Sequence, residues 1–272
     1  MKPAGSDGAP LRKIGRFVRN ILIGAALGGL MLLTAAVLTA DRFLFHPPQT
    51  REAPAAERSA VLPDGEVLAL FYLPPGSEQE LVILYSHGNA EDLSGIAPLL
   101  HHWRRAGFGV LSYDYPGYGR SGGRPSEKGV IRNAEAAWRY LTAECGIRPD
   151  RIVVAGFSVG SGPACHLAEK FTPAALVLLA PFTSAFQVVL PGVKLPFDRF
   201  PNWRRMGRIA APVWILHGTA DRVIAPEHGK RLFDLAPGPG KRLELLPETG
   251  HGDLPWRFDP AGLRGLPRPG AP

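Results

Sequence analysis

Ser158 lies at the centre of a G-x-S-x-G pentapeptide, Gly156–Gly160, which joins an apolar, β-branched run to an expected helix. A serine nucleophile needs a sharp turn between a strand and a helix, because the turn holds the hydroxyl clear of the sheet and glycines relieve the crowding there. The same pattern surrounds Ser121, but in a Gly- and Pro-rich loop with no strand before it and no helix after it. The context therefore predicts Ser158, and not Ser121, as a nucleophile.

A serine hydroxyl is a weak nucleophile and needs a histidine base, which in turn needs a carboxylate to orient it. Of the eight histidines, His251 is favoured because it stands between two glycines in a loop after an expected strand, whereas His217 at a strand end is expected to be structural. Asp221, shortly after that strand end, is the favoured carboxylate. Its rival is Asp253, but a residue so near His251 in sequence rarely turns back to the ring nitrogen distal to the nucleophile.

The three candidates occur in the order Ser158, Asp221, His251, with spacings of 63 and 30 residues (221 − 158 and 251 − 221). This is the order found in α/β-hydrolases, and it differs from the orders in chymotrypsin-like and subtilisin-like enzymes. Attack of a serine on a carbonyl also builds negative charge on oxygen, which prepositioned N–H groups must meet. The backbone N–H of Val159 is one expected donor, and the other should come from the loop after the apolar strand Leu81–Tyr85.

Four short segments resemble a known family: YSHGNAEDLSG at residues 85–95, GFSVGSG at 156–162, HGTADRVI at 217–224 and GHGD at 250–253. They are similar to the serine hydrolases of the α/β-hydrolase superfamily that carry an HGN oxyanion loop. That group includes bacterial membrane-anchored members and eukaryotic relatives that remove acyl groups from proteins or lipids. The resemblance covers roughly residues 59–254. It implies that Asn89 supplies the second oxyanion N–H and that Ser158, Asp221 and His251 form a triad.

Residues Asn20–Ala40 form a stretch of 21 residues without an ionisable side chain, after five basic residues: Lys2, Arg12, Lys13, Arg16 and Arg19. A helix of this length crosses the hydrocarbon core of a bilayer, about 30 Å thick. A cleaved signal peptide would have a shorter apolar region and a small-x-small end, and a buried core helix would not have the basic flank. We therefore expect a basic N-terminus at 1–19, an uncleaved transmembrane helix at 20–40 and a Pro-containing linker at 41–58.

The excess of Lys and Arg before this stretch predicts a cytoplasmic N-terminus and a catalytic domain on the other side of the membrane, periplasmic or outer in a bacterium. The chain has a net charge of +7, but residues 1–40 contribute five basic residues and one acidic residue, which leaves +3 for the rest (7 − 4). So small an excess gives no basic field for nucleic acid, and no nucleic-acid partner is expected.

The rest of the chain alternates short apolar runs with longer amphipathic segments. After a hairpin over 61–73, we expect strands at 81–85, 109–113, 151–156, 175–179, 212–217 and 242–246, and helices at 92–106, 127–144, 159–170 and 226–236. This alternation predicts an α/β fold with a mostly parallel sheet flanked by helices, the α/β-hydrolase fold, over residues 59–254. Residues 255–272 are rich in Pro and Gly and are not expected to form a long helix; without one, part of the sheet face could stay exposed.

The connection between the strands that end near Ala180 and begin near Pro212 is rich in aromatic and apolar residues. In the resembled superfamily this connection can form part of a cap over the active site, so Phe186 and Leu190 are candidates for lining an apolar substrate pocket. The alternative is ordinary core packing. Cys145 and Cys165 match no metal or redox motif, and unpaired cysteines are favoured over a disulfide.

Together these features predict a membrane-anchored serine hydrolase that cleaves carboxylic ester or thioester bonds of a small-molecule or lipid-like acyl substrate through an acyl-enzyme. No metal or cofactor is expected, because the triad chemistry needs none. Two alternatives remain: a serine peptidase of the same fold, and a non-catalytic, membrane-tethered binding module. The sequence leaves the oligomeric state and the acyl chain open.

Overall fold

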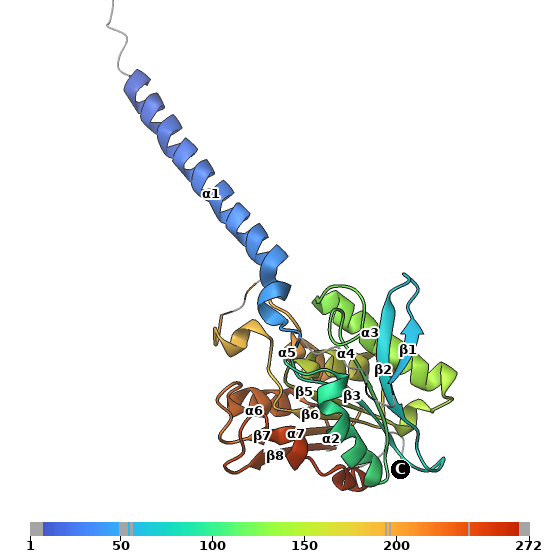
Figure 1. Cartoon of the computed structure of the whole chain (residues 1–272). Coiled ribbons are helices and arrows are strands. Elements are labelled where there is room, and N and C mark those ends of the chain that lie inside the picture. The colour runs from blue at the N-terminus through green and yellow to red at the C-terminus, as the bar shows by residue number, and fades with distance from the viewer. Residues whose placement is uncertain are drawn as a thin grey trace, which may run out of the picture. The chain divides into compact units, whose positions relative to one another are not determined.

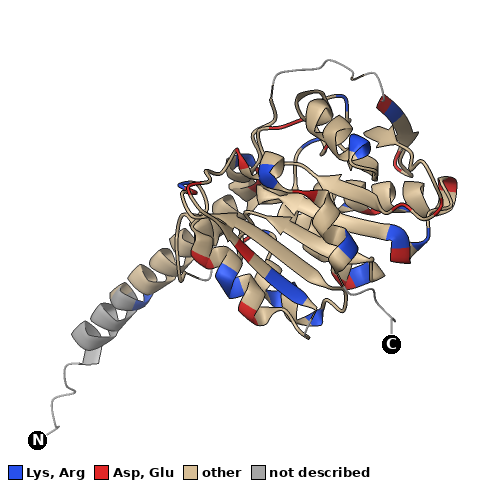
Figure 2. Cartoon of the chain, turned by 90° about the horizontal axis from the view of Figure 1, so that it is seen from below, with Lys and Arg blue, Asp and Glu red and all other residues tan. Residues whose placement is uncertain are grey.

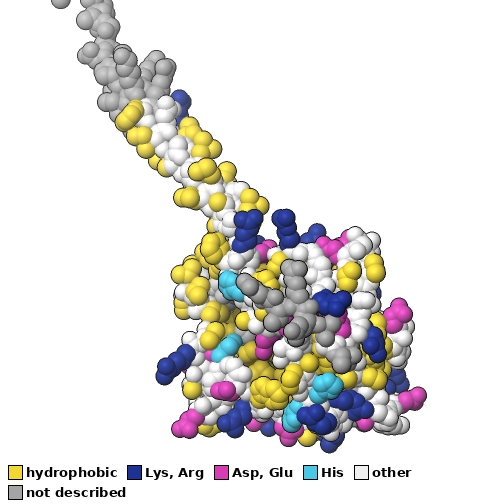
Figure 3. All heavy atoms as spheres, viewed as in Figure 1, with side chains coloured by type: hydrophobic (Ala, Val, Ile, Leu, Met, Phe, Trp, Pro, Cys, Tyr) yellow, Lys and Arg dark blue, Asp and Glu magenta, His cyan; other side chains and the backbone are white. Residues whose placement is uncertain are grey.

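The computed structural model describes residues 8–48, 54, 57–193, 195, 197–238 and 240–266, and it divides into two compact units, Met1–Ala40 and Asp41–Pro272. Helix α1, Gly8–Leu44, makes up the described part of the first unit and continues for four residues into the second (Figure 1). Its part Arg19–Leu44 has a mean hydropathy of 2.4 and is, by length and composition, a candidate membrane span. Exposed apolar side chains cover this part of α1 (Figure 3).

The expected helix end at Ala40 is too early. Helix α1 continues through Asp41 to Leu44, because no helix-breaking residue occurs before Pro47, and proline disfavours helical backbone in the residue before it. The first four residues of the expected linker are therefore helical. Of the basic residues expected before the span, Lys2 lies outside the described residues, and of the side chains of Arg12, Lys13 and Arg16 nothing is described.

Within the described residues, eight strands form one sheet in the order β1-β2-β4-β3-β5-β6-β7-β8. Strands β1 and β2 form an antiparallel hairpin, β2 pairs antiparallel with β4, and the remaining pairs are parallel, which confirms the mostly parallel sheet. The strands are β1 Glu57–Val61, β2 Val67–Leu73, β3 Val82–Ser86, β4 Gly109–Tyr113, β5 Ile152–Phe157, β6 Ala175–Leu179, β7 Val213–Gly218 and β8 Lys241–Leu246.

Helices cover both faces of this sheet (Figure 1). Buried residues of α3, α4 and α6 belong to one hydrophobic cluster, and those of α2 and α7 to the other. Successive residues of β5 alternate between the two clusters, as a strand buried on both faces requires. The helices are α2 Leu93–Arg105, α3 Glu127–Arg139, α4 Ser161–Phe171, α5 Asn202–Arg205, α6 Pro226–Leu235 and α7 Leu254–Arg257.

Two of these helices begin after a side-chain cap. Asp92 accepts a hydrogen bond from the N–H of Gly95 at 2.9 Å, and Ser126 accepts one from the N–H of Gly129 at 3.1 Å. Such caps satisfy N–H groups that have no partner within the helix. At its other end α3 continues as a π-helical turn, Tyr140–Glu144, so that the expected helix 127–144 keeps its length but changes its pitch.

The end of the chain packs on the sheet, which corrects the expectation of an exposed sheet face. After α7, a 3-10 helix at Pro260–Gly265 brings Leu263 into the core. The ring of Phe258 lies 5.6 Å from that of Trp103 and 5.4 Å from that of Trp214. Apolar residues on two short helical turns therefore cover this part of the sheet, where a long helix would otherwise be needed. Residues 267–272 lie outside the described part of the chain.

Charged residues of both signs are interspersed along the second unit, as Figure 2 shows. Both cysteines are free. Cys165 is buried in α4, and burial raises the pKa of its thiol to about 12, so it stays protonated and unreactive at neutral pH.

Candidate active site

Ser158 follows β5 directly and opens a 3-10 turn, Ser158–Gly160, that leads into α4. Its backbone has a φ of +54°, a left-handed conformation that non-glycine residues rarely adopt and that is frequent at functional turns. The flanking glycines are required here. A Cβ on Gly156 would collide with the backbone carbonyl of Gly160, and a Cβ on Gly160 would collide with that of Ser86. The turn therefore has the tight geometry that the pentapeptide predicted.

The structure brings Ser158, Asp221 and His251 together. His251 Nε2 lies 3.1 Å from Ser158 Oγ, and His251 Nδ1 lies 2.7 Å from Asp221 Oδ2. The three residues follow the carboxyl ends of β5, β7 and β8, strands of one parallel array, and loops at these ends meet at one edge of the sheet. The result is one continuous chain of hydrogen bonds from a buried carboxylate through an imidazole to a hydroxyl.

The carboxylate of Asp221 is fixed from several sides. Its Oδ1 accepts hydrogen bonds from the N–H groups of Val223 at 2.8 Å and Ile224 at 2.9 Å, and His217 Nε2 lies 3.5 Å from Oδ2. Burial alone would raise the pKa of Asp221, but hydrogen bonds from His217, His251 and the Ile224 N–H together lower it far below its usual range. Asp221 is therefore ionised at neutral pH.

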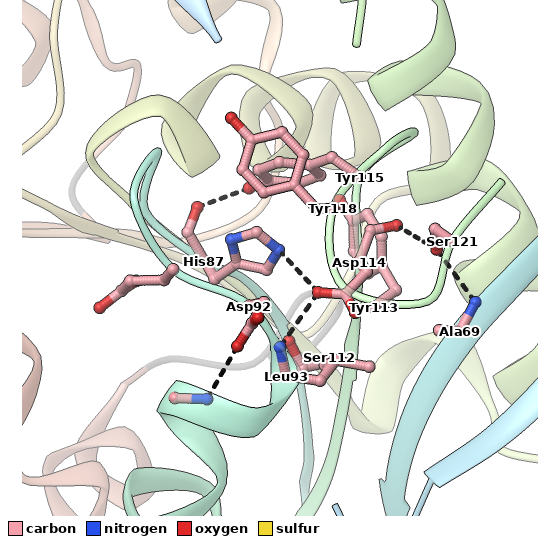
Figure 4. Close-up of polar contacts among 12 residues, drawn as sticks. Ala69, His87, Asp92, Leu93, Ser112, Tyr113, Asp114, Tyr115, Tyr118 and Ser121 are labelled. Carbon is pink, nitrogen blue, oxygen red and sulfur yellow. Dashed lines mark hydrogen bonds and ion pairs between the residues drawn. The ribbon is translucent and has the colours of Figure 1, made fainter. Parts of the chain in front are cut away.

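The two rival candidates, Asp253 and Ser121, do not belong to this chain of hydrogen bonds. Asp253 is exposed at the start of α7, and it makes no hydrogen bond to His251 among the described residues. Ser121 is buried, where it donates to the carbonyl of Asp114 at 2.9 Å and accepts from the N–H of Ala69 at 3.0 Å (Figure 4). Ser121 therefore links two segments of backbone, and its hydroxyl is fully used.

Asn89 and Val159 line the same pocket as Ser158. Val159 lies within the first turn after β5, where N–H groups have no helical partner, since the turn's own hydrogen bond is donated by Ser161 to Ser158. Asn89 lies in the loop after β3. Its side-chain amide is engaged with Leu44 and Tyr118, and the backbone N–H of Asn89 is the group expected to meet a substrate oxygen.

The loop that carries Asn89 is held from behind by a buried polar cluster (Figure 4). The Tyr115 hydroxyl donates to the carbonyl of His87 at 2.5 Å, and His87 Nε2 lies 3.5 Å from Asp114 Oδ1. The same Asp114 oxygen accepts the N–H of Leu93, the first residue of α2, at 3.0 Å. Burial lowers the pKa of His87, but the hydrogen bond and the charge of Asp114 raise it by more. The cluster thus ties the loop and α2 to the end of β4.

A pocket of about 210 Å³ lies over Ser158. Phe186, on the 3-10 turn Phe186–Val188, lines this pocket as predicted, but Leu190 is not among its lining residues and is 45% exposed. The N–H of Leu190 donates to the carbonyl of Phe186 at 2.9 Å, so the backbone of Leu190 stays beside the turn, but its side chain does not line the pocket. The pocket is lined by Phe43, Leu44, Asn89, Ser158, Val159, Phe182, Ala185, Phe186, Val188, Val189, Val223 and Ile224.

Three features of this site were not found from the sequence. Phe43 and Leu44 were expected only as part of the linker 41–58, and the hydrogen bonds of the Asn89 side chain to this segment had no local signal. Val223 and Ile224 follow Asp221 directly, so their place in the pocket could have been inferred from the position of that carboxylate. No group of three or more His, Cys, Asp or Glu that could hold a metal occurs in the described part of the chain.

Comparisons with known proteins find similarity to α/β-hydrolases. A protein-family model described as "Serine aminopeptidase, S33" matches residues 77–199 and 201–254. Alpha/beta hydrolase domain-containing protein 17B of Homo sapiens is 37% identical over 193 residues, which cover 70% of this chain and 67% of that protein. Protein 17C of Mus musculus is 35% identical over 175 residues, which cover 63% of this chain and 54% of that protein.

Solved structures share the fold at low identity. The esterase Pf2001 of Pyrococcus furiosus has a TM-score of 0.65 at 18% identity and covers 76% of this chain and 90% of its own. A serine hydrolase homologue from Coxiella burnetii has a TM-score of 0.61 at 18% identity and covers 79% of this chain and 99% of its own. These similarities establish the α/β-hydrolase fold.

Proposed function

The chain belongs to the serine aminopeptidase S33 family of α/β-hydrolases, and on that premise we propose that it is a membrane-anchored serine hydrolase that cleaves carboxylic ester or thioester bonds through an acyl-enzyme intermediate. One observation carries the proposal. His251 lies within hydrogen-bond distance of both Ser158 Oγ and the buried Asp221 carboxylate, and Ser158 lines an apolar pocket. This is the arrangement that activates a serine for acyl transfer.

In the first half of the reaction, Ser158 Oγ attacks the substrate carbonyl carbon while His251 Nε2 takes the hydroxyl proton. The carbonyl electron pair moves onto oxygen, where the N–H groups of Val159 and Asn89 stabilise it. The oxyanion then collapses, the bond to the alcohol or thiol breaks, and His251 returns its proton to that leaving group. The second half repeats these steps with water as the nucleophile, which releases the acid and free Ser158.

Asp221 has two functions in this cycle. Its hydrogen bond to Nδ1 holds His251 in the tautomer whose Nε2 can accept a proton, and its negative charge stabilises the imidazolium that forms. Because its pKa is lowered far below the usual range, the carboxylate stays ionised throughout. The left-handed backbone of Ser158 contributes by presenting Oγ to His251 without any rearrangement of the strand.

The lining of the pocket favours an acyl substrate over a peptide with a free N-terminus. An aminopeptidase must hold the ammonium group of its substrate, and burying an unpaired ammonium costs several kcal/mol. Among the described residues, the pocket wall contains no Asp or Glu that could pair with it. The walls are instead aromatic and aliphatic, as an acyl chain requires.

We expect the full chain in detergent to hydrolyse p-nitrophenyl butyrate and a butyryl thioester with kcat/KM about 100-fold higher than for alanine p-nitroanilide, since pairing the ammonium is worth roughly 3 kcal/mol. The measurement is initial rates over a concentration series of each substrate. A reversed preference would establish the peptidase alternative. No turnover of any of the three substrates by a protein with a cooperative thermal transition would favour the binding module.

The anchor in this proposal is the apolar helix segment Arg19–Leu44. Five basic residues precede or begin it, and the positive-inside rule then places the N-terminus in the cytoplasm and the catalytic unit on the periplasmic or outer side. An enzyme held in this way acts at a membrane surface, which agrees with an apolar substrate.

Phe186 and Leu190 provide a matched pair for testing the pocket. Replacing Phe186 by alanine removes an aromatic wall, and we expect kcat/KM for p-nitrophenyl octanoate to fall about tenfold or more while that for the acetate changes less than about threefold. Leu190→Ala, outside the pocket, should leave the ratio of octanoate to acetate unchanged. If the two variants shifted this ratio equally, the location of the acyl pocket would be wrong.

A further inference from the structure

The segment Asp41–His46, called here the juxtamembrane segment, directly follows the first unit and is bound to the catalytic unit by several hydrogen bonds. The Asn89 side chain makes a close pair of them. Its Nδ2 donates to the carbonyl of Leu44 at 2.6 Å, and its Oδ1 accepts from the N–H of His46 at 3.2 Å. The hydroxyl of Tyr118 joins both partners, because it donates to Asn89 Oδ1 at 2.7 Å and accepts from the His46 N–H at 3.0 Å. A side chain of the HGN loop therefore holds this segment.

An ion pair fixes the other end of the juxtamembrane segment. Arg199 Nε donates to Asp41 Oδ1 at 2.7 Å and lies 3.8 Å from Glu127 Oε2. All three side chains are largely shielded from solvent, and Arg199 comes from the connection between β6 and β7. A partly shielded pair with a hydrogen bond is worth more than a surface ion pair. The segment is therefore held at two points that lie far from it in sequence.

Apolar contacts complete the attachment. Phe45 is buried, and its ring meets that of Phe200 edge to face at 6.2 Å. Phe43 and Leu44 line the pocket over Ser158. Phe43 is 72% exposed, so it stands at the open rim of the pocket, while the neighbouring Phe45 holds the segment in place.

We propose that the juxtamembrane segment is a substrate-binding element, in which Phe43 and Leu44 form the wall of the pocket that contacts the acyl chain and sets its preferred length. This inference rests on the proposed hydrolase function and adds to it the residues that select the substrate. Asn89 acts as a positioning residue, because its side chain holds the wall and the residue itself lines the pocket. The acyl chain is thus bound between the end of the membrane helix and the Phe186 turn.

The energetic consequence is a dependence on chain length. Each methylene that moves from water into an apolar site contributes about a fourfold gain in binding. A short acetyl group remains near Ser158 and does not need the wall, whereas an octanoyl chain extends along it. Residues that only brace the fold would affect both substrates alike. The ratio of the two rates therefore separates a binding wall from a structural strap.

The test uses the full chain in detergent and compares p-nitrophenyl acetate, butyrate, octanoate and decanoate. We expect the double variant Phe43→Ala/Leu44→Ala to lose about tenfold or more in kcat/KM for octanoate and decanoate, with acetate changed less than about threefold. The single variant Phe43→Leu, which keeps an apolar side chain, should retain most of the parent's preference for octanoate and decanoate over acetate. Phe17→Ala, an exposed apolar residue on the same helix, is the matched control and should leave the profile unchanged. Equal losses at every length, or no loss, would overturn the proposal.

A binding measurement separates failure of this proposal from failure of the proposed function. The Ser158→Ala chain is irradiated with a photoreactive decanoic acid, with and without excess decanoate. We expect displaceable cross-links in the peptide that contains Phe43 and in the peptide that contains Phe186, and about fivefold fewer of both in the Phe43→Ala/Leu44→Ala background. If a fluorophosphonate probe, which reacts with activated serines, did not label Ser158 of the parent chain, the hydrolase function would be wrong. If the yield of cross-links were the same with and without the Phe43→Ala/Leu44→Ala substitutions, only the proposal about the juxtamembrane segment would be wrong.

Discussion

Replacing Ser158 by alanine is expected to abolish covalent labelling by a fluorophosphonate and to lower kcat/KM for ester hydrolysis by roughly 10⁴- to 10⁶-fold. The reason is chemical, since no other described hydroxyl lies at the end of the Asp221–His251 hydrogen-bonded chain. The measurement is in-gel fluorescence of the labelled chain, with initial rates on p-nitrophenyl butyrate. Thermal unfolding of the variant confirms that the fold is retained. Alanine at this position removes the hydroxyl but keeps the left-handed backbone with φ +54°, so the backbone strain remains.

The matched control is Ser121→Ala, because Ser121 occupies the same motif in the sequence. It should keep full labelling at Ser158 while its thermal midpoint falls, since the buried N–H of Ala69 loses its acceptor. A parent protein that folds but shows no labelling would sink the hydrolase proposal and favour a binding module. Labelling that survives in the Ser158→Ala variant would place the nucleophile elsewhere.

The architecture of the sheet was largely predictable because its signals are local. The predicted strands 109–113 and 175–179 coincide with β4 and β6, since each is a short apolar run between turn residues. Helices α2 and α3 start within one residue of the expected positions, directly after Asp92 and Ser126, whose side chains cap them. The order of the strands is different in kind, because β4 lies between β2 and β3 through pairings that no local pattern encodes.

Local context was also sufficient to choose Ser158, Asp221 and His251 as neighbours. Each follows an apolar strand, and parallel strands place their carboxyl ends at one edge, so the residues had to lie close together. Asp221 was preferred to Asp253 because Asp253 lies too near His251 in sequence to turn back to the ring nitrogen distal to Ser158. What the sequence could not provide was the attachment of Leu44 to Asn89, which are 45 residues apart and depend on Tyr118. Leu190 was misplaced because apolar character alone does not decide which side chains of an irregular connection line the pocket.

The comparison of Asp221→Asn with Asp253→Asn tests the geometry most sharply, because the two residues were the rival carboxylates. Asparagine at 221 keeps the shape of the side chain but removes its charge, and its amide nitrogen can donate towards Nδ1 and favour the wrong tautomer of His251. We expect kcat to fall by about 10⁴-fold, as losing the orienting carboxylate does in serine proteases. Asp253→Asn should change kcat by less than about threefold, since Asp253 is exposed and makes no hydrogen bond to His251 among the described residues.

Fluorophosphonate labelling distinguishes a loss of orientation from a loss of fold. The Asp221→Asn chain should react with the probe about 10³-fold or more slowly than the parent, yet reach the same final labelling, because Ser158 and His251 remain in place.

The dependence of stability on pH adds a further constraint. The hydrogen bonds that lower the pKa of Asp221 stabilise its ionised form in the folded state, so the parent should lose stability as pH falls through about 4, the unfolded value, and below. Asparagine does not titrate, so acid should destabilise the variant less. Equal activity losses in both aspartate variants would contradict the assignment, because only Asp221 reaches the imidazole.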